Sequence, residues 1–420
     1  MQDEVLEHVT RFYLEAADFK GMPLATLRSI LGSDVVPAVA ALVQMDRAEV
    51  LGASHDINTH IKRFGVGKKE RQLEALERDD PQHTCIYPSG AHLASAVDRS
   101  LYDGKPYALD LALDAAQLSY RSFDLAVLET YRNDPRYNFK SAGVGGQLCV
   151  SDAYYESEHM LPRDQVLLET FGFSVNGEYG RAVAVFVCYL ARLSPEHQQL
   201  WKARELDGHF RLHPIYFKNS ILGEWHDEIP ILYAFLMELA LINEMAAAMG
   251  RPQLFRDTPV GPEELKGFDF LLRPTQAEFD AFVVLLDKLL SDNLNKAFFG
   301  TDISDEAEEE RADGKIVVRP KGTIQMLDEW FRLKFRSNNC SPWEATIGTL
   351  KNVRKLRQKP AHAIRADAFD HKFSAEQRQL IVSVYDAVRT IRLCLANHPN
   401  VRRKNIEINP ALFEGKICDF

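Results

Sequence analysis

The chain has 420 residues, of which 46% are hydrophobic and 26% are charged. That composition is ordinary for a soluble globular protein, so it excludes a fibrous or intrinsically disordered chain and leaves room for two or three domains. The acidic, amphipathic start lacks the basic residues and apolar run of a signal peptide, and no apolar stretch reaches the roughly 18 residues of a membrane span. We therefore expect a cytoplasmic protein with no membrane partner.

Cysteine spacing and charge narrow the possible functions. The six cysteines include no Cys-x-x-Cys pair, so the sequence indicates neither a disulfide framework nor a zinc site. The net charge is −10, yet Lys315 to Lys404 holds 19 Lys and Arg against 7 Asp and Glu, a local +12 that leaves −22 elsewhere. A basic segment on an acidic body is typical of a polyanion-binding module, although solvated helix faces give the same count.

Residues 1–80 have the element order of a winged helix. Pro23 to Leu31 and Asp34 to Met45 are helical patterns joined by Gly32-Ser33, and the alternation from Arg47 to Ile61 predicts two short strands. In a winged helix the second of these helices enters the DNA major groove, but Asp34 to Met45 contains no Lys or Arg. We therefore expect this winged-helix-like domain to bind a protein partner or to be structural, with DNA reading as the alternative.

Residues 81–260 predict a mixed α/β middle domain. Two strands between Gln165 and Val187 are expected to meet at the turn Asn176-Gly177. An apolar helix, Pro230 to Met249, ends the domain. The stretch Thr258 to Gly267 is rich in proline and glycine, so we place the domain boundary there.

Two groups of ionisable residues in this domain have part of the pattern of a chemical site. His209 and His213 are four apart, as in a metal-binding helix, but Gly208 and Pro214 disfavour a regular helix and no third ligand follows at a fixed offset. The cluster Glu224-Trp225-His226-Asp227-Glu228 precedes a helix, where the helix dipole alone favours acids. We therefore predict no metal site and no cofactor.

Residues 261–420 are predicted to form a four-helix bundle. Three of its helices open with capping boxes, whose first residues are Thr275, Ser341 and Ser374. The first helix is expected to run to Phe299 and to be followed by an acidic loop, Asp302 to Glu310. The expected core contains Phe279, Leu286, Leu327, Trp330, Ile347, Leu350 and Val384. The whole fold is then α+β and mainly α, with domains at 1–80, 81–260 and 261–420.

The third helix of this bundle carries charge on the face that should be buried. Its stripe follows the three-and-four spacing of a helix through Trp343, Ile347, Leu350, Arg354 and Arg357. A guanidinium keeps its charge, so Arg357 in such a position requires a buried acid or an anionic ligand such as phosphate. Pro360 then bends or ends the helix before His362, which allows the imidazole and the guanidinium to converge on one ligand.

The segment Arg357-Gln358-Lys359-Pro360-Ala361-His362 resembles the signature of the HEPN family (higher eukaryotes and prokaryotes nucleotide-binding), an arginine and a histidine separated by four to six residues. Members of that family are small helical bundles, and many are metal-independent ribonucleases that act as dimers, often in antiviral defence or toxin-like roles. The resemblance covers the last third of the chain. It implies that Arg357 and His362 are catalytic, that RNA is the partner, and that the chain forms a homodimer. Gln358 departs from the asparagine, aspartate or histidine that is commoner after the arginine.

The chemistry implied by the resemblance uses these groups and the RNA itself. RNA supplies its 2′-hydroxyl as the nucleophile, and His362 transfers the proton as base or acid. Arg357 stabilises the pentacoordinate phosphorane through paired hydrogen bonds. Cleavage of single-stranded RNA then leaves a 2′,3′-cyclic phosphate and a 5′-hydroxyl. The residues expected to bind the RNA are Arg354, Lys355, Gln358 and Lys359.

Three other functions fit the same residues. A non-catalytic HEPN-like module would bind RNA or a nucleotide through the basic surface and would not need His362. A regulator would act through the winged-helix-like domain. In a purely structural bundle, Arg357 would pair with an acid on a neighbouring helix, such as Asp328, Glu329 or Asp386.

Overall fold

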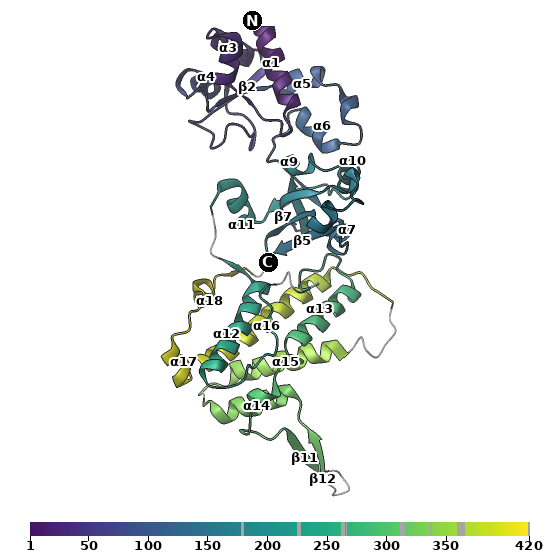
Figure 1. Ribbon diagram of the computed structural model, residues 1–420, viewed down its shortest axis with the longest axis vertical. Helices are drawn as coiled ribbons and strands as arrows, with labels where there is room; N and C mark the ends of the chain where they lie inside the picture. Colours follow the sequence, from purple (N-terminus) through teal and green to yellow (C-terminus); the bar gives the residue numbers. More distant parts are fainter. Residues whose placement is uncertain are drawn as a thin grey trace. The chain divides into compact units, whose positions relative to one another are not determined.

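Figure 1 shows the computed structural model, which describes residues 1–177, 180–224, 228–261, 265, 267–310, 316–336, 338–358 and 366–418. The chain divides into two compact units, Met1–Lys140 with Gly145–Trp225, and Ser141–Val144 with His226–Phe420. About 50% of the structure is helix and 16% is strand, in mixed sheets. The expected class, α+β and mainly α, is therefore confirmed.

The first unit begins with three helices around a small antiparallel sheet. The helices are α1 (Gln2–Glu15), α2 (Leu24–Leu31) and α3 (Val35–Gln44). The strands are β1 (Met22–Pro23), β2 (Ala48–Gly52) and β3 (Thr84–Pro88), in the order β1-β3-β2, and α4 (Lys69–Arg78) lies between β2 and β3 in the chain. Apolar residues at helical spacing, including Val5, Val9, Val39 and Leu42, fill the core between helices and sheet. The two helices predicted here are confirmed as α2 and α3.

The second strand predicted for this domain, through Ile57, Thr59 and Ile61, is wrong. This segment has no strand, Ile57 is 80% exposed, and the Tyr87 hydroxyl donates to the Thr59 carbonyl at 2.9 Å. Strand β2 pairs with β3 instead, with Leu51 opposite its partner Cys85. Because β3 lies beyond residue 80, the sheet crosses the boundary predicted there. Apolar and polar residues can alternate in an irregular segment as they do in a strand, so the pattern alone was misleading. The strand that pairs with β2 lies farther along the sequence.

The chain after β3 is built around a six-stranded sheet in the order β4-β8-β7-β6-β5, with β9 paired to β7. The strands are β4 (Tyr120–Phe123), β5 (Tyr137–Ala142), β6 (Gly145–Val150), β7 (Leu167–Asn176), β8 (Gly180–Phe186) and β9 (Arg211–Leu212). The helices are α5 (Gly90–Ala96), α6 (Pro106–Ala112), α7 (Glu129–Arg132), α8 (Asp152–Tyr155), α9 (Val187–Leu190), α10 (Pro195–Lys202) and α11 (Pro214–Phe217). Shorter turns are the 3₁₀ helices η1 (Arg99–Tyr102), η2 (Leu125–Leu128) and η3 (Pro162–Asp164), and the π-helical η4 (Lys218–Leu222). The hairpin predicted between Gln165 and Val187 is confirmed as β7 and β8, with Asn176 opposite Gly180.

A hydrogen-bonded group of rings connects α7 and α10. The Trp201 indole donates to the Tyr131 hydroxyl at 2.9 Å, and that hydroxyl lies 2.8 Å from Nδ1 of His197. His197 is only 8% exposed. Burial lowers the pKa of its imidazole, although Asp164 and Glu196 act in the opposite direction. The neutral ring is therefore hydrogen-bonded to the Tyr131 hydroxyl as part of the core.

The second unit is mainly helical. Its helices are α12 (Ile231–Ala248), α13 (Gln276–Leu289), α14 (Thr323–Lys334), α15 (Ser341–Gln358), α16 (Lys372–Ala396), α17 (Pro399–Lys404) and α18 (Pro410–Glu414), with a 3₁₀ turn, η6 (Lys296–Phe298). Strand β10 (Ile229–Pro230) is parallel to β13 (Ile417–Cys418), and β11 (Glu306–Glu310) forms a hairpin with β12 (Ile316–Pro320). Helix α16 packs against α12 and α15, and α13 packs against α15 (Figure 1). All seven predicted core residues of the bundle are at most 5% exposed.

Helix α12 belongs to this helical unit, whereas the sequence assigned it to the middle domain. Its Glu238 forms a fully buried ion pair with Arg392 of α16. The division between the units therefore falls before α12 and not within Thr258 to Gly267. By length and composition α12 could cross a membrane, but 61% of that stretch is buried inside the unit, as in the core helix of a soluble protein.

The end of α13 and the acidic segment differ from expectation. Helix α13 stops at Leu289 and not at Phe299, because the chain turns and Asn295 caps a separate 3₁₀ helix through the Ala297 amide at 3.0 Å. The segment predicted as an acidic loop contains strand β11. Its partner β12 follows closely in the chain, so a local hairpin forms despite the run of glutamates.

One predicted helix cap is confirmed and another is wrong. The Thr275 hydroxyl accepts the Glu278 amide at 3.2 Å at the start of α13. The Glu278 carboxylate accepts the Leu272 and Arg273 amides and not the Thr275 amide, so this cap forms without the reciprocal half of a capping box. Helix α16 begins at Lys372, before the predicted cap Ser374. Gln377 of that predicted box is 6% exposed, and its side chain instead accepts the Leu271 amide and donates to the Asp269 carbonyl, both in the connection between α12 and α13.

Candidate functional site

Helix α15 presents its apolar face to the bundle as its sequence predicts. Ile347 and Leu350 are 4% and 2% exposed. Trp343 stacks on Phe331 of α14, with ring centroids 4.0 Å apart. These contacts fix the rotation of α15 about its axis, so the two arginines of its last turns are directed to the end of α13.

Arg354 and Arg357 share two carboxylates there. Nη1 of Arg354 lies 2.8 Å from Oδ2 of Asp287 and 2.5 Å from Oδ1 of Asp292. Nη1 of Arg357 lies 2.6 Å from the same Asp287 oxygen and also donates to Oδ2 of Asp292. The four side chains form a closed network of ion pairs, which we call the Arg–Asp cluster.

The Arg–Asp cluster is buried on one side and open on the other. Asp287 is 0% exposed, whereas Asp292, Arg354 and Arg357 are 37%, 41% and 31% exposed. A buried carboxylate is strongly unfavourable unless it is paired, and Oδ1 of Asp287 has no hydrogen-bond partner among the described residues. Asp287 therefore depends on both arginines, while Asp292 lies at the solvent edge of the cluster.

Backbone contacts hold the two acids in place. The Asp292 amide donates to the Asp287 carbonyl at 3.1 Å, so the turn after α13 fixes their separation. Arg256 donates to the Asp292 carbonyl at 3.3 Å, and the Thr323 hydroxyl donates to the Ser291 carbonyl at 2.8 Å. This turn is thus anchored to two other segments of the unit, which makes the cluster preorganised.

The charges of the cluster stabilise one another. Partial burial raises the pKa of Asp292, but hydrogen bonds from Arg354 and Arg357 outweigh it and the net shift is downward. Hydrogen bonds to the two acids raise the pKa of both arginines. Two guanidiniums and two carboxylates leave no formal net charge. An anionic ligand that enters the cluster therefore has to replace a carboxylate, and Asp292 is the accessible one.

The structure describes only some of the predicted site residues. Lys355 and Gln358 lie on the exposed face of α15, and neither has a hydrogen bond or ion pair among the described residues. Lys359 and His362 lie outside the described residues. The structure therefore brings Arg354 and Arg357 together and leaves the position of the histidine untested.

The sequence did not reveal that Asp287 and Asp292 are the partners of Arg357. None of the three acids suggested for that role contacts it in the described structure, and Asp328 accepts from Arg332 at 2.7 Å instead. A signal was nevertheless present. Asp287 follows the buried Val283 by four residues, so it interrupts an apolar stripe just as the arginine does.

His209 and His213 from the middle region do not lie on one regular helix. His213 caps α11 by accepting the Ile215 amide at 3.3 Å, and Gly208 has a φ of +119° that a helix does not allow. No group of three or more His, Cys, Asp or Glu side chains suited to a metal occurs in the part of the chain that the structure describes. Residues 225–227 of the acidic cluster lie outside that part.

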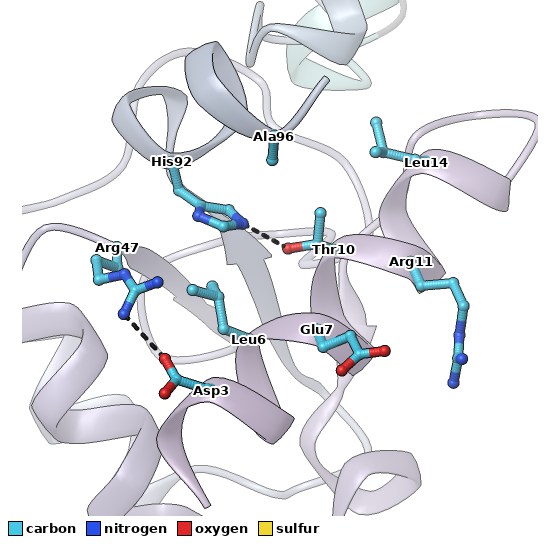
Figure 2. Close-up of a pocket in the computed structure, with 9 residues that line it drawn as sticks. All are labelled: Asp3, Leu6, Glu7, Thr10, Arg11, Leu14, Arg47, His92 and Ala96. Atoms are coloured by element: carbon cyan, nitrogen blue, oxygen red, sulfur yellow. Dashed lines mark hydrogen bonds and ion pairs between the residues drawn. The ribbon is translucent and has the colours of Figure 1, made fainter. Parts of the chain in front are cut away.

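A concave surface in the first unit lies between α1 and α5 (Figure 2). It has a volume of about 390 Å³, and Leu6 is among the residues that line it. The His92 imidazole lies 3.0 Å from the Thr10 hydroxyl, and Arg47 donates to Asp3 at 3.2 Å. The lining contains two acids and two arginines, so its formal charge is zero and it indicates no class of ligand.

The Arg–Asp cluster is the strongest candidate site in the described part of the chain. It places two arginines at the solvent edge of a bundle within a strongly basic segment. No protein-family model, curated protein or solved structure matches this chain. The evidence for its function therefore lies in its own residues and contacts.

Proposed function

We propose that the Arg–Asp cluster is the phosphate-binding half of a ribonuclease site that His362 completes. The observation that carries the proposal is the convergence of Arg354 and Arg357 on the same two carboxylates. Guanidinium groups that hold carboxylates in this way have the geometry to hold phosphate oxygens. His362 follows Arg357 by five residues, and this spacing on a helical bundle resembles the HEPN motif.

In the proposed reaction the 2′-hydroxyl of single-stranded RNA loses its proton and attacks the adjacent phosphorus. The bond from phosphorus to the 5′-oxygen breaks, and that oxygen takes a proton. The products are a 2′,3′-cyclic phosphate and a 5′-hydroxyl. Neutral His362 acts as the base or, when protonated, as the acid. Arg357 stabilises the negative charge on the non-bridging oxygens.

Binding of RNA requires one carboxylate to release its arginine partners. Asp287 is fully buried and would be left unpaired, whereas Asp292 is 37% exposed and can turn to water. The RNA phosphate therefore replaces Asp292, and Asp287 continues to orient both arginines. Lys355 and Gln358, exposed on α15, and Lys359 beyond it add contacts to the RNA backbone.

The finer domain layout is part of the proposal. The order α1, β1, α2, α3, β2, β3 and the sheet order β1-β3-β2 support a winged-helix-like N-terminal domain with α4 inserted before the last strand. Helix α3 has no Lys or Arg, which favours a protein partner over DNA. In the second unit, α13 to α16 form the HEPN-like bundle.

Assembly and location follow from the same resemblance. Two copies of the chain are proposed to meet as a homodimer, so that two motifs form one composite site. The six cysteines are all free, which supports a cytoplasmic protein. A defence or toxin-like role is an analogy at the level of the family.

A non-catalytic RNA-binding module is the second candidate, because the structure holds both arginines in ion pairs. RNA cleavage and RNA affinity of His362→Ala separate the two functions, with His371→Ala as a matched control in the same unit. A nuclease loses about 10²-fold to 10⁴-fold in rate in His362→Ala and keeps its affinity. Binding without cleavage by the wild-type protein supports the module. Absence of RNA binding overturns both functions.

A further inference from the structure

A cavity of about 330 Å³ in the first unit is lined by cations and, among the described residues, by no acid. Its walls come from η1, α6 and Lys105 between them, from η3 and the residue after it, and from α10 with the connection that precedes it. Lys105 and Arg192 are its only charged lining residues. The volume falls within the range of about 300–1,000 Å³ that is usual for small-molecule sites.

This positive lining is not a general property of the region. Residues 1–225 contain 23 Lys and Arg against 31 Asp and Glu, a net charge of −8. The side chain of Lys105 has no hydrogen bond or ion pair among the described residues. Among the described residues the one ion pair of Arg192 is with Glu169 at 3.0 Å, and its guanidinium also lies 6.0 Å from the centre of the Tyr189 ring. The paired side chains are 42% and 51% exposed, so the ion pair is weak and an anion can displace it. Both cations are available to an anion.

The walls of the cavity are held together by a buried glutamine. Gln198 is 0% exposed, and its carboxamide oxygen accepts the amides of Tyr107 and Ala108 at 3.2 and 3.4 Å. Its nitrogen donates to the carbonyls of Ala191 and Leu193 at 3.1 and 2.9 Å. One side chain therefore joins α6 to the α9–α10 connection, and the cavity between them is preorganised.

The rest of the lining suits an uncharged organic group. Leu101, which is 70% exposed, and Pro195 provide apolar contact area at the rim. Tyr102 and Gln165 add polar groups. Burial raises the pKa of Tyr102, so its hydroxyl remains a neutral donor.

We propose that this cavity binds a small organic phosphate monoester, with Lys105 and Arg192 in contact with the phosphate. A phosphate monoester carries up to two negative charges near neutral pH, which two cations balance. Such cations form strong charge-assisted hydrogen bonds to phosphate oxygens. The organic group then lies against the apolar rim. This site is separate from the Arg–Asp cluster, and the proposal does not depend on ribonuclease activity.

Isothermal titration calorimetry on the full chain tests the proposal. The probes are adenosine monophosphate, ribose 5-phosphate, inorganic phosphate and adenosine. We expect at least one of the two esters to bind more tightly than inorganic phosphate, and adenosine to bind at least tenfold more weakly than its monophosphate. Binding of neither ester, or equal affinity for inorganic phosphate and both esters, overturns the proposal.

Variants assign the contacts. Lys105→Ala and Arg192→Ala should each weaken ester binding about tenfold or more, because a hydrogen bond to a charged group is lost. The control is Arg99→Ala, an exposed arginine on η1 that does not line the cavity. Unchanged affinity in both cavity variants, or an equal loss in Arg99→Ala, contradicts the assignment. Thermal melting of each variant checks that its fold is intact.

Discussion

Replacement of Asp287 by Asn tests whether the buried carboxylate holds the Arg–Asp cluster together. The change keeps the size of the side chain and removes its charge, so both guanidiniums lose their buried partner. Breaking a buried ion pair costs about 3–5 kcal/mol. Arg354 and Arg357 are 41% and 31% exposed and can turn to water, so we expect a smaller loss of roughly 2 kcal/mol in the stability of the helical unit.

The matched control is Asp292→Asn, which removes the same charge from the solvent edge. Asp292 is 37% exposed, so its ion pairs resemble surface pairs and are worth about 0–1 kcal/mol. Differential scanning calorimetry of the full chain compares the two variants through the melting transition of the helical unit. Equal losses in the two variants, or no loss in Asp287→Asn, refute the reasoning.

The same two variants should change RNA affinity in opposite directions. Asp292→Asn removes the carboxylate that competes with phosphate, so it should bind single-stranded RNA about tenfold more tightly. Asp287→Asn releases both arginines from their orientation and should bind more weakly. Fluorescence anisotropy with a short labelled RNA measures both constants. Weaker binding by Asp292→Asn contradicts the view that RNA replaces this side chain.

Two further predictions concern the first unit. The folded pKa of His197 is lowered from 6.5, so the unfolded chain binds more protons and stability should fall as pH drops below about 6.5. The free energy of unfolding, measured with urea from pH 7 to 5, should depend less on pH in His197→Gln than in the wild-type protein. An unchanged pH dependence in this variant counts against the burial argument. Lys62 is 4% exposed between Glu49 and Asp114, which are 20% and 18% exposed. Lys62→Met should lower the free energy of unfolding in urea by about 3–5 kcal/mol, because Glu49 and Asp114 are left without their shared cation. An unchanged free energy of unfolding would refute the ion pairs of Lys62 with these two acids.

Local patterns in the sequence predicted the elements of the helical bundle. The stripe through Ile347 and Leu350 places α15 correctly, and the Thr275 cap marks the start of α13. Each of these signals depends on residues that are only a few positions apart, so it can be recognised in the sequence without knowledge of the fold. The hairpin of β7 and β8 was predictable for the same reason.

Contacts between distant segments were not predictable in this way. Strand β3 pairs with β2 across a long insertion. The prediction instead paired β2 with the alternating segment through Ile57, which is nearer in sequence but forms no strand. The buried pair of Glu238 and Arg392 joins α12 to α16, although 154 residues separate them, so the domain boundary was misplaced. Asp287 shows the limit most clearly, because its position in a buried stripe was visible but its partners lie in another helix.

In the proposed mechanism, RNA supplies its own nucleophile to a site formed by Arg357 and His362. The most direct measurement is the cleavage rate of two single-stranded RNAs in the presence of EDTA. One is all-ribose, and the other carries a single 2′-deoxy nucleotide at the cut position. We expect the first to be cleaved to a 2′,3′-cyclic phosphate and the second to resist at that position. Equal cleavage of both, or activity only when magnesium is restored, would contradict the account.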